Sequence, residues 1–179
     1  MLVLDVTKIP PEGQDVDSPL TAGEVHLEGE DSFVLEAGGR LVCRVEKGDG
    51  ESVHVRGRLT AQLGVDCSRC LEAYSHAVAQ ELDLFYLPRV AGLDSEEDAE
   101  LSDRELVVAY YDAARIDLGE MIREQLFLGL PMKRLCSEGC QGLCPSCGVD
   151  RNASSCQCVP EDEHVSSPFS KLTLKGPNS

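Results

Sequence analysis

The chain has 179 residues, and 32 acidic side chains against 16 basic ones give it a formal net charge of −16. Free nucleic acid repels such a surface, because phosphate binding depends on Lys and Arg. Apolar residues make up 42% of the sequence, but aromatic residues only 4%, and Trp is absent. We therefore expect a globular protein with an aliphatic core. With no secretory signal and no apolar run long enough to span a membrane, we expect it to be cytoplasmic.

The first 90 residues have the pattern of a β domain. Residues 53–65 alternate small or apolar side chains with polar ones, as a strand with one buried face does. Residues 75–87 predict a second strand that places Val78, Leu82, Leu84 and Tyr86 on one side. These two strands would form a hairpin with Cys67-Ser-Arg-Cys70 at its tip.

Weaker signals in the same region predict further strands at 2–6, 24–27 and 40–45. Gly57 and Gly64 interrupt the best strand pattern, and we expect them to mark a bulge and a bend.

An acidic segment follows this region. Residues 94–105 contain seven acids and one Arg, which predicts a solvated loop, with docking of a basic partner as the alternative. The next residues, 106–111, are apolar and β-branched enough to form another strand.

One helix is expected. Asp117 and Glu120 form a capping box, in which the Asp side chain accepts hydrogen bonds from the first free amides. Apolar residues then follow at helical spacing until Pro131 ends the helix.

Together these features predict an α+β fold. We expect a mainly antiparallel small β domain, barrel- or sandwich-like, with one capped helix and a C-terminal Cys-rich zinc module. The expected divisions are a β domain with the CxxC hairpin tip (1–90), an acidic loop and strand (91–115), the helix plus zinc module (116–160) and a C-terminal tail (161–179).

Eight of the nine cysteines stand in four close pairs. The pairs are Cys67 with Cys70, Cys136 with Cys140, Cys144 with Cys147, and Cys156 with Cys158. The segment around the last three pairs is poor in apolar residues and needs another source of folding free energy, which thiolate–zinc bonds supply. Four pairs are enough for two tetrahedral sites, so we expect two zinc ions.

The spacing favours one division of these ligands. Cys144-Pro-Ser-Cys147-Gly has the form of a zinc knuckle, and we assign Cys156 and Cys158 to the same ion. Cys67, Cys70, Cys136 and Cys140 would then hold the other ion. In the alternative, Cys136 and Cys140 join Cys144 and Cys147. Disulfide or dithiol redox chemistry and an iron–sulfur cluster also remain as interpretations of the pairs.

The ninth cysteine and the four histidines do not form the pattern of a catalytic site. Cys43 lies on the apolar side of an expected strand and should be buried, whereas His26, His54, His76 and His164 lack ligand spacing and should lie at the surface. The sequence has no nucleophile with a partner base, phosphate-binding Gly loop or paired-carboxylate site, and four-thiolate zinc sites are closed. We therefore expect no enzyme and no small-molecule substrate.

Several motifs give the chain a family likeness. They are Cys67-Ser-Arg-Cys70-Leu71-Glu72, Ile116-Asp117-Leu118, Glu124-Gln-Leu-Phe-Leu-Gly-Leu-Pro131-Met, Cys136-Ser-Glu-Gly-Cys140-Gln-Gly142-Leu-Cys144-Pro-Ser-Cys147-Gly, Asn152, Cys156-Gln-Cys158 and Ser167-Pro168-Phe169. In these motifs the chain resembles the YceD family, the large ribosomal RNA subunit accumulation proteins of bacteria and plastids. The likeness runs from about residue 50 to residue 175.

The resemblance implies a role in the synthesis, processing or stability of large-subunit (23S) ribosomal RNA, with no catalytic residues to carry over. Combined with the acidic charge, it predicts a non-enzymatic ribosome-assembly factor that binds a basic ribosomal protein or pre-ribosomal particle and contacts rRNA indirectly, if at all. The alternatives are a direct RNA-binding zinc module and a redox-switched zinc regulator.

Overall fold

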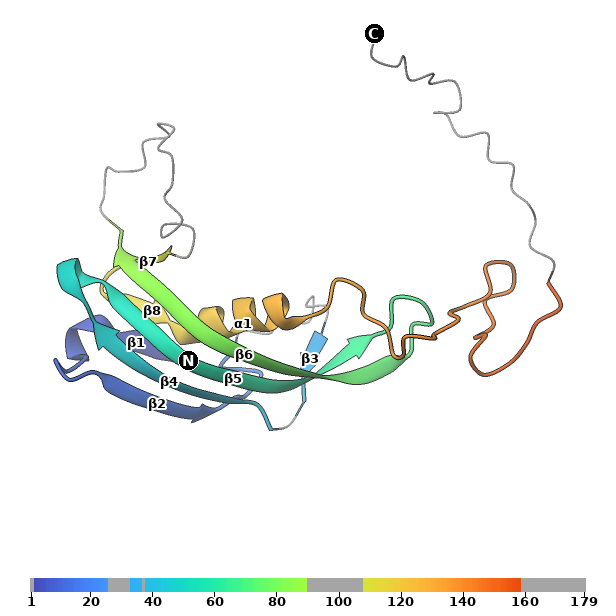
Figure 1. The fold of residues 1–179 in the computed structure, drawn as a ribbon, viewed down its shortest axis with the longest axis horizontal. Helices are drawn as coiled ribbons and strands as arrows, with labels where there is room; N and C mark the ends of the chain where they lie inside the picture. The colour runs from blue at the N-terminus through green and yellow to red at the C-terminus, as the bar shows by residue number, and fades with distance from the viewer. Residues whose placement is uncertain (1, 26–32, 37, 90–107, 159–179) are drawn as a thin grey trace, which may run out of the picture.

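A computed structural model of the chain describes residues 2–25, 33–36, 38–89 and 108–158 (Figure 1). These residues are mostly β-sheet with one α-helix, which confirms the α+β class. The acidic segment 94–105, the tail 161–179, His26 and His164 lie outside the described residues.

The elements follow one another along the chain in this order: β1 (Val3–Asp5), the 3-10 helix η1 (Val6–Lys8), β2 (Gln14–Pro19), β3 (Phe33–Leu35), β4 (Arg40–Lys47), the 3-10 helix η2 (Asp49–Glu51), β5 (Val53–Asp66), β6 (Ala73–Pro88), β7 (Val108–Tyr111), β8 (Arg115–Asp117) and α1 (Leu118–Gly129).

The long hairpin of β5 and β6 is the framework of the fold. Its antiparallel register runs without interruption from Val53 opposite Tyr86 to Asp66 opposite Ala73. The alternation of buried and exposed residues along β5 confirms the predicted strand. The Cys67–Cys70 turn closes the hairpin, as the sequence predicted.

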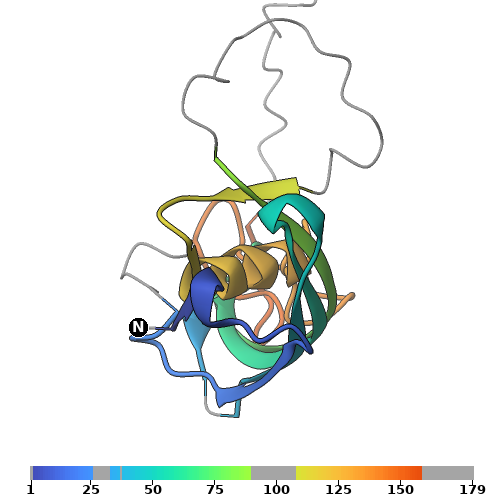
Figure 2. The same cartoon turned by 90° about the vertical axis from the view of Figure 1, so that its left-hand side faces the viewer.

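The other strands extend this hairpin into a curved sheet. The hydrogen-bonded order is β2-β4-β5-β6-β7, with β3 beside β5, and β1 and β8 form a separate pair. β7 joins β6 in parallel, whereas the other pairs are antiparallel. Seen end-on, the sheet curls around α1 (Figure 2). The order of the described strands is an open path from β2 to β7, which does not establish the expected barrel or sandwich.

The core lies between the concave face of the sheet and α1. Its fully buried large side chains are aliphatic, as the composition predicted, and include Leu41, Leu59, Leu63, Ile122 and Leu126. Burying such side chains is the main source of stability for this part of the molecule.

The helix begins and ends where the sequence predicted. The Asp117 carboxylate accepts hydrogen bonds from the amides of Gly119 (2.9 Å) and Glu120 (3.2 Å), which have no partner within the helix. The helix ends at Gly129, two residues before Pro131. It therefore releases the chain toward the cysteines at the tip of the hairpin (Figure 1).

Two local predictions were wrong. Glu24 and Val25 do not begin a strand, because both amides bond to the carbonyl of Thr21 in a turn, while the Thr21 hydroxyl donates to the Glu24 carboxylate (2.6 Å). Gly57 does not mark a bulge, because the registers of β5 with β4 and β6 both run through it. A Cβ atom there would lie closer than 3.0 Å to Val42 O and to Cys43 Cα.

Gly57→Ala should therefore destabilise the sheet by about 2 kcal/mol, because β4 backbone must move to admit the methyl group. The measurement is the free energy of unfolding in urea. Gly23→Ala adds the same methyl group where nothing lies within 4 Å and should change this free energy little. Equal losses in the two variants would contradict close packing at Gly57.

Candidate metal centre

The first cluster consists of Cys67 and Cys70 at the hairpin tip and Cys136 and Cys140 after α1. Their sulfurs all lie within 4.8 Å of one another. The Sγ atoms of Cys67 and Cys140 are 3.7 Å apart, and those of Cys70 and Cys136 are 3.6 Å apart. A tetrahedron with metal–sulfur bonds of about 2.3 Å has edges of about 3.8 Å. The first cluster could therefore hold a metal ion with little movement.

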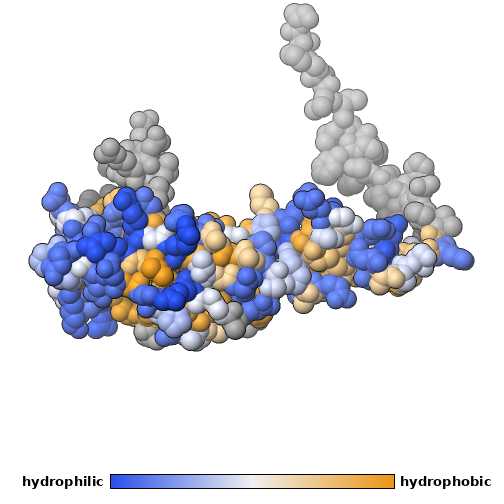
Figure 3. Space-filling view, turned by 60° about the horizontal axis from the view of Figure 1, so that its bottom comes forward, coloured by the Kyte–Doolittle hydropathy of each residue, from blue (hydrophilic) through white to orange (hydrophobic). Residues whose placement is uncertain are grey.

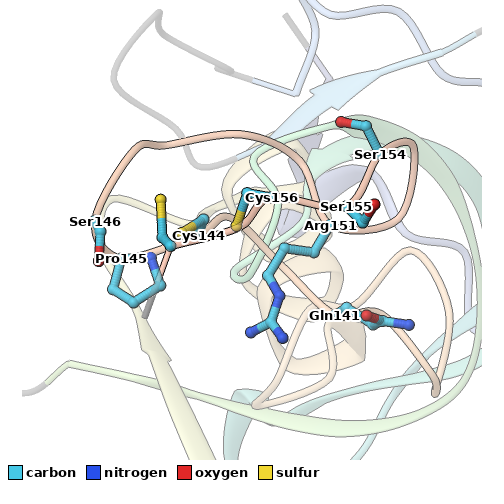
Figure 4. Close-up of a pocket in the computed structure, with 9 residues that line it drawn as sticks. Gln141, Cys144, Pro145, Ser146, Arg151, Ser154, Ser155 and Cys156 are labelled. Carbon is cyan, nitrogen blue, oxygen red and sulfur yellow. The ribbon is translucent and has the colours of Figure 1, made fainter. Parts of the chain in front are cut away.

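The second cluster consists of Cys144, Cys147, Cys156 and Cys158, whose sulfurs also lie within 4.8 Å of one another. Only Cys144 is buried. Three of the four cysteines line a hollow of about 190 Å³ together with Arg151 (Figure 4). This cluster is closer to solvent than the first. The eight thiols are thus grouped as their spacing favoured, and Cys136 and Cys140 do not join Cys144 and Cys147.

The two clusters contain the same backbone turn. At Cys67 and at Cys144, the amide donates to the carbonyl five residues later, and the carbonyl accepts from the amide four residues later. The amides two and three residues after each of these cysteines bond to its sulfur. Thiolates accept such bonds, so both turns could bind a cation through sulfur.

The turns differ at the residue after the second cysteine. Gly148 has a φ of 73° in the second cluster, and Leu71 has a φ of 62° in the first. Positive φ is ordinary for glycine and costs a leucine roughly 1–2 kcal/mol. Leu71 is also 67% exposed, so burial of its side chain offsets little of this strain.

Within each cluster the thiols differ in acidity. Burial raises the pKa of Cys67, but the amides of Cys136, Cys70 and Arg69 outweigh it and lower that pKa to about 6. The amide of Glu72 lowers the pKa of Cys70, but burial and the neighbouring thiols outweigh it and raise that pKa to about 12. In each cluster one thiol therefore loses its proton easily and a second one does not. A divalent cation bound among the sulfurs would lower the pKa of the second thiol and stabilise both thiolates.

The second cluster repeats this division. The amides of Cys147 and Ser146 lower the pKa of Cys144 to about 6. Hydrogen bonding to Cys147, followed by burial, raises the pKa of Cys158 to about 12. The shared pattern follows from the shared turn and from four sulfurs packed in a small space.

Hydrogen bonds also join the hairpin tip to the chain after α1. The Ser68 amide donates to the Arg134 carbonyl (2.7 Å), and the Arg69 guanidinium donates to the Cys140 carbonyl (2.8 Å). The Arg69 carbonyl accepts from the Leu143 amide (3.0 Å). The first cluster is therefore held by backbone contacts as well as by sulfur.

Asn152 connects the two clusters. It lies in the loop between Cys147 and Cys156, yet its side-chain amide donates to Cys140 Sγ (3.4 Å) in the first cluster. Its side-chain oxygen accepts from the Gln141 amide (2.8 Å). Sequence reasoning assigned Asn152 no role, and its presence in a family motif was the one available signal.

The other candidate residues lie apart from the clusters. Cys43 is buried in β4, and burial, followed by the charge of Asp15, raises the pKa of its thiol to about 11. His54 stacks on Phe85 on the sheet and contacts Asp83. All nine cysteines are free thiols in the structure.

The fold and the clusters define a class of protein: a curved β-sheet wrapped around one helix, with two four-cysteine groups at one end. The chain belongs to the family described as large ribosomal RNA subunit accumulation protein YceD, whose model matches residues 55–175. This description implies a role in the accumulation of large-subunit ribosomal RNA.

Individual relatives are matched over part of their lengths. A chloroplastic YCED homolog from Zea mays is 33% identical over 43% of the chain and 26% of the maize protein. Uncharacterized proteins of Mycobacterium leprae and Mycobacterium tuberculosis strain H37Rv are 34% and 36% identical over 68% and 61% of the chain. These alignments cover 54% and 49% of the mycobacterial proteins. No solved structure matches the chain.

Among the described residues, no helix has the length and apolar character that crossing a lipid bilayer requires.

Cys144→Ser should lower the metal content from two ions per chain to one and leave the β5–β6 hairpin folded, because the clusters share no ligand. Elemental analysis and circular dichroism of anaerobically purified protein measure both effects. Cys43→Ala is the control and should retain both ions. Loss of both ions from Cys144→Ser would contradict separate sites.

Asn152→Asp should weaken metal binding at the first cluster by about tenfold or more, because a carboxylate replaces the N–H that donates to Cys140 Sγ. Chelator competition in a Cys144→Ser background isolates the first cluster. Ser155→Ala changes an exposed residue of the same loop and should leave this affinity unchanged. An unaltered affinity in Asn152→Asp would show that the hydrogen bond from Asn152 to Cys140 does not support metal binding at the first cluster.

Proposed function

We propose that this chain is a non-enzymatic assembly factor that supports the accumulation of large-subunit ribosomal RNA by binding a basic ribosomal protein or a pre-ribosomal particle. The family match carries the ribosomal part of this proposal. The partner follows from charge, because 16 more acids than bases favour a basic protein over free RNA.

We propose that both clusters hold zinc. Four thiolates around one ion are typical of structural zinc, and soft sulfur ligands disfavour magnesium and calcium. When bound, zinc would add folding free energy and fix the hairpin tip against the chain after α1. A site with four protein ligands has no open position for substrate, which supports a non-enzymatic role.

The pairing of arginines on the sheet supports a protein partner. Arg40, Arg44, Arg56 and Arg58 are exposed side chains of β4 and β5, on a face where hydrophilic side chains surround hydrophobic patches (Figure 3). Each lies in an ion pair with an acid, such as Arg40 with Asp17 (2.7 Å) and Arg44 with Asp15 (3.1 Å). These partners would compete with RNA phosphates for the arginines.

Removing the protein should lower mature large-subunit ribosomal RNA relative to small-subunit ribosomal RNA. The purified protein should bind pre-large-subunit particles and lose that binding when one basic ribosomal protein is stripped from them. The two measurements are the ratio of the rRNAs in cells with and without the gene, and binding to intact and stripped particles.

Binding to naked ribosomal RNA is the comparison that separates the alternatives. Tight, salt-sensitive binding to naked RNA, unchanged by added ribosomal proteins, would favour a direct RNA-binding module. Reversible loss of zinc and of particle binding after peroxide treatment would favour a redox-switched regulator.

A further inference from the structure

A groove that neither cysteine cluster lines lies where α1 passes the ends of β6 and β7 and the start of β8. Its volume is about 440 Å³. Its charged lining residues are Asp112, Asp117, Glu120 and Glu124 against Arg89 and Arg115. Acids therefore outnumber bases by two, and neither metal cluster contributes to this groove.

Tyr86 lines the groove and contributes a hydroxyl to it. The residue is 7% exposed, and among the described residues no hydrogen bond to its hydroxyl is present. The neighbouring Tyr111, equally buried, donates to the Glu51 carbonyl (2.7 Å). A buried hydroxyl without a protein partner is uncommon, and a group bound in the groove could supply that partner.

The strand register explains why Tyr86 meets a hollow. Its neighbour on β7 is Ala109, whose short side chain covers little of the tyrosine ring. On the other side β5 places Val53, which is fully buried. The small residue thus leaves space on the side that faces β7.

Two carboxylates line the same groove as this hydroxyl. Glu120 and Glu124 are exposed and one turn apart on α1, and within the described residues neither has an ion pair. Like charges at this spacing destabilise a helix. Burial first, and then the charges of Glu124 and Glu120, raise the pKa of Tyr86, so both acids act on the groove.

Three of the other four charges in the groove have partners of their own. Arg89 pairs with Asp112 (3.5 Å), and Asp117 caps the helix. Among the basic residues of the lining, Arg115 is the one left to offset the charges of Glu120 and Glu124. The local charge available to a ligand is therefore negative.

We propose that this groove binds the cationic side chain of a lysine or arginine in a basic protein segment. The ammonium or guanidinium group would donate to Glu120, Glu124 and the Tyr86 oxygen, and its apolar stem would pack beside Ala109. This inference rests on the proposed function for the identity of the partner as a basic protein, and assigns the surface that recognises it.

The probe is a short synthetic peptide of lysine, glycine and alanine, titrated into the ¹⁵N-labelled full chain at low salt. A neutral peptide with norleucine in place of lysine is its matched comparison. The lysine peptide should shift the amide signals of Ala109, Glu120 and Glu124, and the norleucine peptide should not. Equal shifts with both peptides would overturn the role of charge.

Variants then test the residues. Glu120→Gln with Glu124→Gln should weaken peptide binding by about tenfold. Glu12→Gln with Glu36→Gln makes the same change of net charge at exposed positions elsewhere and should weaken it by less than about twofold. Equal weakening by the two double variants would overturn the site in favour of general attraction.

Tyr86→Phe separates ligand binding from folding. It removes a hydroxyl that has no partner among the residues the structure describes, so the thermal unfolding midpoint should stay the same or rise. Peptide binding should nevertheless weaken by about threefold or more, because a buried acceptor for the cation is lost. Unchanged binding in this variant would overturn the role of Tyr86.

Particle binding distinguishes failure of this inference from failure of the proposed function. If the wild-type chain binds pre-large-subunit particles and the Glu120→Gln, Glu124→Gln chain binds them equally well, the groove is not the docking site and the proposed function stands. If the wild-type chain binds no particle, the proposed function fails, whatever the peptide result.

Discussion

The contact among four cysteine sulfurs at the tip of the long hairpin is the constraint on which the rest of the C-terminal structure depends. Beyond the part of the sheet that α1 covers, the buried cluster contains Cys67, Cys70 and Cys140, with Tyr74 and Leu135 packed against them. So little apolar surface cannot fix a hairpin tip against a separate segment. A cation shared by the thiolates would fix the hairpin tip against that segment. The second cluster in turn takes its position from the first.

Features that depend on neighbouring residues could be predicted from the sequence. Alternation over 53–65 indicated β5, and Asp117 with Pro131 indicated both ends of α1, because strand pleating and helix capping act within a few residues. The structure groups the eight thiols as their spacing favoured, because cysteines two to four residues apart lie close together in one turn. Tetrahedral geometry then left few ways to combine four pairs.

Features that depend on distant residues could not be predicted. β2, with the sequence QDVDSP, has no strand pattern and forms because β4 offers it an edge. The parallel pairing of β7 with β6 sets Ala109 beside Tyr86, and nothing in either segment indicates that register. The groove is a product of this pairing and of the approach of α1. The Asn152 contact likewise needs the two clusters to be assembled first.

With metal bound, the unequal burial of the two clusters would give them different exchange kinetics. Three of the four thiols are buried in the first cluster and one of the four in the second. A chelator or a thiol-reactive reagent must reach sulfur to displace an ion, so it would strip the outer cluster well before the inner one. The chain would then pass through a half-loaded intermediate in which the sheet, the helix and the hairpin tip remain joined.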